Sequence, residues 1–224
     1  MHKKKAVLFD MDGTILDSLQ DLMDSVNFAL KGTGFGPYGL EQYRYFVGNG
    51  ARNLIRRAIA GCVDPVAEGC EPDPALVDEV MARFKGHYET NKTNKTAPYE
   101  GIMELLVKLK EQGYLTAVIS NKYDAAVKEL AVKYFDGLLS AAVGEGGDVR
   151  PKPEPDGINK VLKQFGLTRE EAIYVGDSDV DVVTAHNAGL FCVGVTWGFR
   201  GRQELEQAGA EAVIDTPEEL WNFI

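Results

Sequence analysis

Apolar residues recur with two different spacings along this chain of 224 residues. Up to about residue 95 they recur at i, i+3, i+4 and i+7, which predicts amphipathic helices over 18–30, 40–46, 51–60 and 75–88. After residue 96, short apolar runs predict strands over 114–120, 137–143, 172–175, 191–196 and 212–214. Helices are expected between them, over 101–112, 124–134, 157–165, 180–187 and 203–207, with a last one at the C-terminus.

Another apolar run, Val7-Leu8-Phe9, stands near the start of the chain. It does not alternate with polar residues, which is typical of a parallel strand buried on both faces. Repeated strand–helix units imply a parallel sheet with helices on both faces. We therefore predict an α/β protein with a doubly wound, Rossmann-like core, residues 1–15 and 96–224, and an inserted helical cap, residues 16–95.

Two aspartates, Asp10 and Asp12, end the first apolar run. Parallel sheets bind ligands just beyond the carboxyl ends of their strands. If the strand stays extended to Asp12, both carboxylates point to one side, about 7 Å apart along the chain. A strand end cannot neutralise two carboxylates, so the pair predicts a cation, a proton or water at this place.

Three further polar clusters follow predicted strands and fall at the same edge of the predicted sheet. They are Ser120-Asn121-Lys122, Lys152 in the proline-rich loop 150–155, and Gly176-Asp177-Ser178-Asp179-Val180-Asp181. Each cluster alone has an ordinary explanation, such as a turn, a helix cap or a solvated lysine. Four such clusters at one sheet edge favour a ligand site instead.

The chain lacks the signatures of several other sites. Neither acidic segment has the glycine and glutamate spacing of a calcium-binding loop, and there is no GxxxxGK[ST] phosphate loop. The stretch 144–149 lacks the third glycine of a dinucleotide fingerprint, and no Ser-His-Asp arrangement is legible. The acidic strand ends therefore remain the main candidates for chemistry.

The four clusters resemble, in chain order, the four motifs of the haloacid dehalogenase superfamily. The matching residues are Asp10-Met11-Asp12-Gly13-Thr14, Ser120-Asn121, Lys152 before a proline, and Gly176-Asp177-Ser178-Asp179-Val180-Asp181. The stretches 12–18, 47–50, 120–122 and 195–198 are most similar to phosphoglycolate phosphatases and their near relatives, and Asp12 sets the chain apart from the dehalogenases themselves. The resemblance implies a Mg²⁺-dependent phosphatase that acts on a small phosphomonoester such as phosphoglycolate.

The resemblance also implies roles for the aspartates. Asp10 is expected to attack phosphorus and form an aspartyl-phosphate, while Asp12 acts first as general acid and then as general base. Mg²⁺ is expected to bind the Asp10 carboxylate, the Asp12 backbone carbonyl and Asp177. Asp181 is expected to orient a metal-bound water or Lys152.

Five residues are candidates for substrate binding. Lys152, Ser120 and the Asn121 N–H group are expected to contact the phosphoryl oxygens. Asn49 and Arg52, where a cap helix begins, are expected to hold a second anionic group such as a carboxylate. A glycine turn between two helices explains the Asn49 region equally well.

Three other functions remain open. A pyrophosphatase or nucleotidase would use the same core. A phosphomutase of the β-phosphoglucomutase type would use the same intermediate, but its relatives carry a histidine where the segment 17–21 has none. A non-catalytic binding protein would not need intact Asp10, Asp12, Lys152 and Asp177.

The composition limits the classes of binding partner that are expected. A formal net charge of −10 argues against nucleic acid or an anionic membrane, but allows a small phosphorylated anion held by local cations.

Cys62, Cys70 and Cys192 form no CxxC pair and favour reduced thiols, with a Cys62–Cys70 disulfide as the minor alternative. No stretch approaches the roughly 20 apolar residues of a membrane span, and the first apolar run is too short for a signal peptide. We expect a cytoplasmic monomer or weak homodimer.

Overall fold

The computed structural model describes residues 3–224, so Met1 and His2, which begin the predicted core segment, lie outside it. The described chain divides into two compact units. One contains the chain up to Leu16 together with Pro98–Ile224, and the other contains Asp17–Ala97. The chain crosses from one unit to the other in β2 (Leu16–Asp17) and β3 (Ala97–Pro98), which pair with each other as a separate two-stranded sheet.

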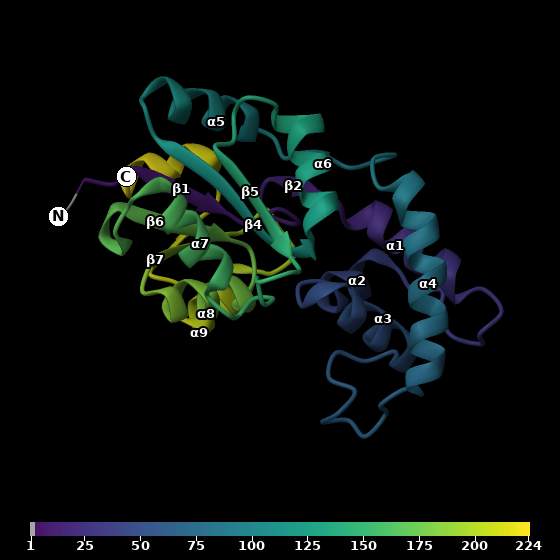
Figure 1. Ribbon diagram of the computed structural model, residues 1–224. Helices are drawn as coiled ribbons and strands as arrows, with labels where there is room; N and C mark the ends of the chain where they lie inside the picture. The colour runs from purple at the N-terminus through teal and green to yellow at the C-terminus, as the bar shows by residue number, and fades with distance from the viewer. Residues whose placement is uncertain (1–2) are drawn as a thin grey trace. The chain divides into compact units, whose positions relative to one another are not determined.

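A parallel sheet forms the centre of the first unit (Figure 1). Among the described residues it has six strands in the order β5-β4-β1-β6-β7-β8, and all neighbouring pairs are parallel. The strands are β1 (Ala6–Phe9), β4 (Leu115–Tyr123), β5 (Ala141–Glu145), β6 (Ala172–Gly176), β7 (Phe191–Val195) and β8 (Ala212–Ile214). Since parallel strands all end at one edge, the residues that follow β1, β4 and β6 come together there.

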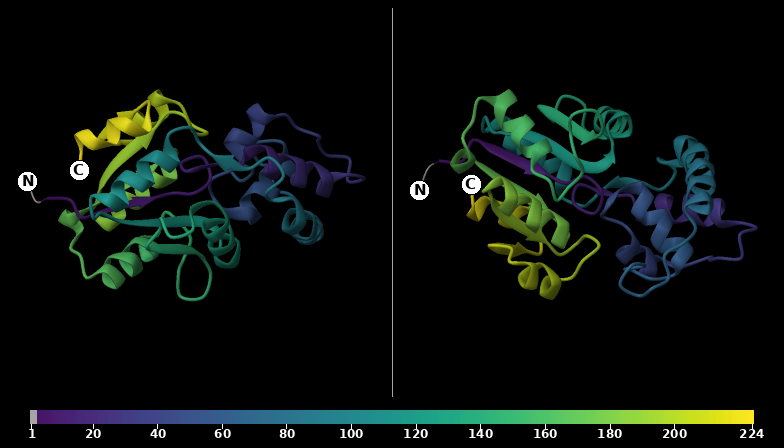
Figure 2. Two further views of the ribbon diagram at one scale, coloured as in Figure 1. Left: turned by 90° about the horizontal axis from the view of Figure 1, so that it is seen from above. Right: turned by 60° about the horizontal axis from the view of Figure 1, so that its bottom comes forward.

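Helices cover both faces of this sheet, as Figures 1 and 2 show. They are α5 (Ile102–Glu111), α6 (Asp124–Phe135), α7 (Asp156–Phe165), α8 (Asp179–Ala188) and α9 (Arg202–Ala208), with 3₁₀ segments η1 (Arg169–Glu171) and η2 (Pro217–Asn222). Val7 and Phe9 of β1 pack in one apolar cluster with residues of α5 and α6, whereas Ala6 and Leu8 pack in another with residues of α7 and α8. The unbroken apolar run thus fills both faces, and the predicted doubly wound fold is confirmed.

The second unit is helical. It contains α1 (Leu19–Leu30), α2 (Leu40–Phe46), α3 (Gly50–Ala60) and α4 (Pro74–Asn91). The apolar stripes predicted from helical spacing are buried, for example Leu22 and Val26 in α1 and Val80 and Phe84 in α4. Each such side chain contributes about 1.5–3 kcal/mol to stability. Within residues 3–224, no helix combines the length and the apolar character needed to cross a membrane.

Several predicted boundaries differ from the structure. The strand expected over 137–143 is β5, which begins only at Ala141, and the strand expected to end at Ser120 continues as β4 to Tyr123. The C-terminal helix is the 3₁₀ segment η2, and the two-residue strands β2 and β3 were not predicted.

Candidate active site

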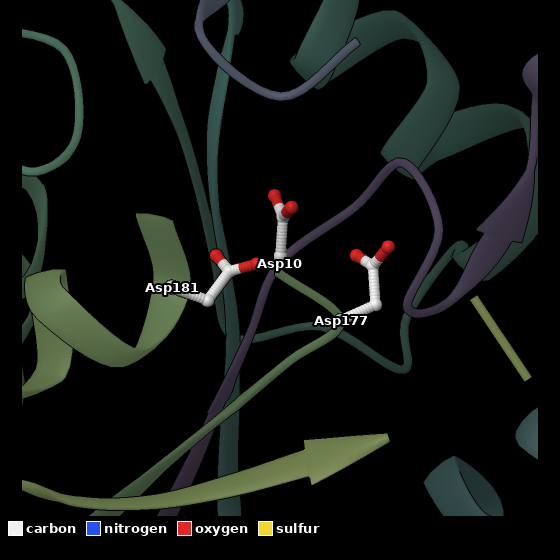
Figure 3. A group of neighbouring side chains, drawn as sticks. All are labelled: Asp10, Asp177 and Asp181. Carbon is white, nitrogen blue, oxygen red and sulfur yellow. The ribbon is translucent and has the colours of Figure 1, made fainter. Parts of the chain in front are cut away.

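Asp10 lies directly beyond β1, at the carboxyl edge of the sheet (Figure 3). Its N–H group donates to Val175 O at 2.9 Å, so the backbone stays fixed one residue past the strand. The chain then turns, because Met11 O accepts a hydrogen bond from Leu16 N at 2.9 Å. The strand is therefore not extended to Asp12, and the condition for aligning the two aspartates along one strand is not met.

Asp10, Asp177 and Asp181 form an acidic group in which one carboxylate oxygen of each lies within 4.8 Å of the others. Asp177 directly follows β6, and Asp181 lies in the first turn of α8 with its carboxylate near Asp10 (Figure 3). The three residues are 8%, 1% and 0% exposed. Buried carboxylates this close repel one another and need a counter-charge.

Lys152 supplies positive charge to the acidic group. Its Nζ lies 2.8 Å from Asp10 Oδ1 and 2.7 Å from Asp181 Oδ1. Burial alone lowers the pKa of Lys152, but the neighbouring Asp10 and Asp181 carboxylates outweigh it and raise this pKa well above its ordinary value. The Asn121 side chain holds the Lys152 backbone from both sides, since its Oδ1 accepts from Lys152 N at 2.6 Å and its Nδ2 donates to Lys152 O at 3.1 Å.

Charge remains unbalanced in this group. Three carboxylates against one ammonium leave these four side chains with a formal excess of two negative charges. Burial is the largest cause that raises the pKa of Asp10 well above its ordinary value, and Asp181 and Asp177 raise it further against the opposing Lys152. Burial, and next Asp181, raise the pKa of Asp177 to about 7. Excess negative charge on clustered oxygen ligands suits a hard divalent cation, so the donor set fits Mg²⁺.

The Asp177 carboxylate is fixed by two donors and two glycines. Its Oδ1 accepts from Thr14 Oγ1 at 3.1 Å, and its Oδ2 accepts from Phe199 N at 2.8 Å. A Cβ atom on Gly13 would lie 2.3 Å from Asp177 Oδ2, and one on Gly198 would lie 2.3 Å from Asp177 Cβ. A larger residue at either glycine would displace the carboxylate.

Asp181 is held by donors on both of its oxygens. Oδ2 accepts from Ser178 Oγ at 2.6 Å and from Ser178 N at 3.1 Å, while Oδ1 lies near Lys152 Nζ and 3.3 Å from Tyr174 Oη. Tyr174 Oη also lies 3.4 Å from Lys152 Nζ and 3.3 Å from Ile119 O. Sequence reasoning missed Tyr174. The available signal was a tyrosine inside an otherwise aliphatic buried strand, since a buried hydroxyl group needs a partner.

Asp12 pairs with a different lysine. Lys122 Nζ lies 3.0 Å from Asp12 Oδ2, and the two side chains are 6% and 13% exposed. The Lys122 N–H group donates to Ser120 Oγ at 3.3 Å. The predicted cluster at 120–122 thus contains a further site residue, Lys122, to which no role was assigned from the sequence.

The structure brings together the candidate residues of the first unit. These are Asp10, Asp12, Ser120, Asn121, Lys152, Asp177 and Asp181. The other two candidates lie in the second unit. Asn49 directly precedes α3, where its carbonyl accepts from Asn53 Nδ2 at 2.8 Å, and the exposed Arg52 places Nη1 2.6 Å from Asp78 Oδ1.

Comparison with known proteins gives consistent matches. A sequence model described as haloacid dehalogenase-like hydrolase matches residues 7–195. The phosphoglycolate phosphatase of Pseudomonas putida is 36% identical over 213 residues, which cover 94% of this chain and 76% of that protein. That of Rhodobacter capsulatus is 37% identical over 202 residues, covering 87% and 85%.

Two solved structures are also similar over nearly the whole chain. A protein from Lactobacillus delbrueckii subsp. bulgaricus has a TM-score of 0.91 and 36% identity, with 97% of each chain covered. One from Haemophilus somnus 129PT has a TM-score of 0.88 and 30% identity, covering 99% of this chain and 98% of that one. Both bear the name phosphoglycolate phosphatase, and in both cases this activity is a prediction.

Proposed function

The chain belongs to the haloacid dehalogenase-like hydrolase family and is a phosphatase, and from this premise we propose that it hydrolyses a small, phosphoglycolate-like phosphomonoester with Mg²⁺ as cofactor. One observation carries the proposal: buried carboxylates outnumber the lysine that pairs with them at the carboxyl edge of the sheet. The relatives that bear the name phosphoglycolate phosphatase support the substrate class.

In this proposal Asp10 is the nucleophile. A carboxylate oxygen of Asp10 forms a bond to phosphorus while the bond to the ester oxygen breaks and Asp12 donates a proton to that oxygen. Water then attacks the aspartyl-phosphate and releases phosphate, and Asp12 takes the proton from this water. Asp10 and Asp12 form ion pairs with different lysines, Lys152 and Lys122, so the two carboxyl groups do not share one counter-charge.

The remaining residues of the first unit hold charge and position. Mg²⁺ would bind the Asp10 and Asp177 carboxylates and the Asp12 carbonyl, and when bound it would neutralise charge on the phosphoryl oxygens. Lys152 presents its ammonium group to the same oxygens, and Asp181 keeps that ammonium in place. The Ser120 hydroxyl and the Asn121 N–H group donate the remaining hydrogen bonds to phosphate.

We further propose that the helical unit, residues 17–97, acts as a cap that supplies substrate selectivity. Asn49 and Arg52, where α3 begins, would bind the carboxylate of the substrate. An Arg52→Ala variant should raise KM for phosphoglycolate and leave KM for a phosphomonoester without a carboxylate unchanged. If KM stays the same for every ester, Arg52 does not bind substrate.

A phosphate-release assay tests the catalytic proposal. The full-length protein with Mg²⁺ is given phosphoglycolate, pyrophosphate, nucleoside monophosphates and hexose phosphates, and kcat/KM is expected to be highest for phosphoglycolate. Highest activity on pyrophosphate or nucleotides would instead identify the pyrophosphatase or nucleotidase alternative, and the appearance of an isomeric sugar phosphate would identify a mutase. Chelation by EDTA should abolish turnover, and added Mg²⁺ should restore it.

An Asp10→Asn variant separates the nucleophile from general folding effects. It should lower kcat by about 10³-fold or more, because removal of a nucleophile leaves only the binding contribution to catalysis. Asp24→Asn, at a partly exposed carboxylate in α1 that pairs with Lys95, is the matched control and should keep full activity. Turnover by folded Asp10→Asn near that of the unchanged protein would refute the nucleophile assignment.

A further inference from the structure

Two cysteines touch each other in the loop between α3 and α4. Cys62 Sγ lies 2.8 Å from Cys70 Sγ, and both residues are half-buried. Cys192 is buried within β7, in the other unit. The loop therefore carries a dithiol pair, separate from the phosphatase site in sequence and in chemistry.

The fold of the loop keeps the two sulfur atoms together. Cys62 directly follows Gly61, the C-cap of α3. Cys70 N donates to Pro65 O at 2.9 Å, which curls the segment between the two cysteines into a compact turn. The next residue is anchored to α3, because Arg56 Nε lies 2.7 Å from Glu71 Oε1 and Arg56 Nη2 lies 2.5 Å from Glu71 Oε2. Little chain motion is needed before a bond can form between the sulfurs, which lowers the entropic cost of closing the ring.

We propose that Cys62 and Cys70 are a redox-responsive pair that a peroxide converts reversibly to an intramolecular disulfide. The Cys70 thiolate attacks one peroxide oxygen and the O–O bond breaks, which forms Cys70 sulfenic acid and hydroxide; the hydroxide takes up the proton that the Cys70 thiol released on ionising and becomes water. The Cys62 sulfur then attacks the Cys70 sulfur, the S–O bond breaks, and the leaving hydroxide takes the thiol proton to form a second water. The two thiols lose two electrons and two protons in total, and one hydrogen peroxide becomes two waters.

The surroundings of Cys62 favour this order of attack. Burial, and next the hydrogen bond with Cys70, raise the pKa of Cys62 to about 12. Cys62 thus stays protonated near neutral pH and acts as the resolving thiol. A pair of this kind in a protein with reduced thiols is typical of redox sensing rather than of a permanent structural disulfide.

Peptide mapping tests the pair directly in the full-length protein. Reduced protein is treated with hydrogen peroxide, its remaining thiols are alkylated, and trypsin then releases residues 58–83 as one peptide that contains both cysteines. We expect this peptide to lose the mass of two hydrogens and to resist alkylation. Glu-C protease cuts after Glu68, between the cysteines, and the two halves should stay joined until dithiothreitol is added.

Thiol titration of variants provides the controls. Oxidation should remove two of the three thiols in the unchanged protein and the only two in Cys192→Ser, and dithiothreitol should restore them. Cys62→Ser and Cys70→Ser should each yield no cross-linked peptide. Retention of all three thiols, addition of oxygen to either cysteine without cross-linking, or disulfides only between chains would overturn the proposal. None of these readouts depends on phosphatase activity.

Discussion

Ion pairs of nearly equal length occur in very different surroundings in the two units. Lys152 Nζ lies 2.7 Å from Asp181 Oδ1, and these side chains are 3% and 0% exposed. Arg52 Nη1 lies 2.6 Å from Asp78 Oδ1, and these side chains are 54% and 65% exposed. Water screens the second pair, whereas the first must offset a large desolvation penalty. Burial of excess negative charge at the sheet edge is unfavourable for folding alone. It is explained if the site binds a metal cation and, together with it, a phosphoryl group.

Replacement of the positively charged residue in each pair should give the largest difference in stability between the two units. Lys152→Met should destabilise the metal-free protein by about 3–5 kcal/mol, because Asp10 and Asp181 would be left buried without compensation. Arg52→Ala should change the unfolding free energy by less than about 1 kcal/mol. Urea unfolding measures both. Equal losses for the two variants would mean that burial does not distinguish the units.

A second comparison lies inside the helical unit, where one buried carboxylate has only structural partners. Asp21 in α1 is 2% exposed and accepts hydrogen bonds from Lys95 N, Thr96 N and Thr96 Oγ1 at 2.8–3.1 Å. Asp21→Asn would turn an amide donor toward these donors and should lower stability by about 2–3 kcal/mol. Asp24→Asn, with a side chain that is 40% exposed, should stay within about 0.5 kcal/mol of the unchanged protein in the same unfolding measurement. Similar losses for Asp21→Asn and Asp24→Asn would show that the backbone donors do not depend on the Asp21 charge.

The sequence predicted best the features that follow from the parallel sheet. Asp10, Lys152 and Asp177 could be placed at one edge because parallel strands share the direction of their carboxyl ends. The first and last residues of the helices and strands were less predictable. Apolar Leu138 and Leu139 suggested a strand, yet they pack against the core before β5 begins. Apolar residues can be buried from a turn as well as from a strand, so the pattern cannot place that boundary.

The side-chain pairs of the site could not be predicted from the sequence. Polar residues at 120–122 suggested a strand end, but β4 continues past an irregularity after Ile119 and pairs Tyr123 with Glu145. This extension carries Lys122 to Asp12, and no residue pattern specifies that pairing. Tyr174 could not be predicted for a similar reason. Tyrosine has a high strand propensity, and two of its hydroxyl partners, Lys152 and Ile119, are 22 and 55 residues away in the sequence.

Two buried tyrosines allow the same chemical change to be made in both units. Tyr174 lies beside Lys152 and Asp181, while Tyr43 in α2 places Oη 2.9 Å from Asn27 Oδ1. Each change to phenylalanine should lower stability by about 0.5–1.5 kcal/mol, the net value of one hydrogen bond. Only Tyr174→Phe should also reduce kcat, by about 10-fold, because it loosens Lys152, the lysine proposed to contact the phosphoryl group. Thermal unfolding and steady-state kinetics separate these effects, and equal kcat values for the two variants would remove Tyr174 from the positioning of Lys152.

The smallest expected effect concerns an exposed ion pair that supports the Lys152 loop. Asp156, the first residue of α7, accepts from Arg150 N at 3.1 Å and lies 2.8 Å from Arg150 Nε and Nη2. The hydrogen bond from the Arg150 side chain is the main cause that lowers the pKa of Asp156 from 3.8 to about 2.

Because the folded pKa of Asp156 lies below its unfolded value, its contribution to stability is complete above about pH 4 and is lost as pH falls through about 2. Asp156→Asn should therefore be slightly less stable than the unchanged protein near neutral pH, and this difference should shrink between about pH 4 and pH 2. Urea unfolding across that range measures it, with Glu111→Gln, at an exposed carboxylate in α5, as the control. A difference that does not change with pH would mean that Asp156 holds the loop through packing, and that the difference between screened and buried charges does not account for the loop that carries Lys152.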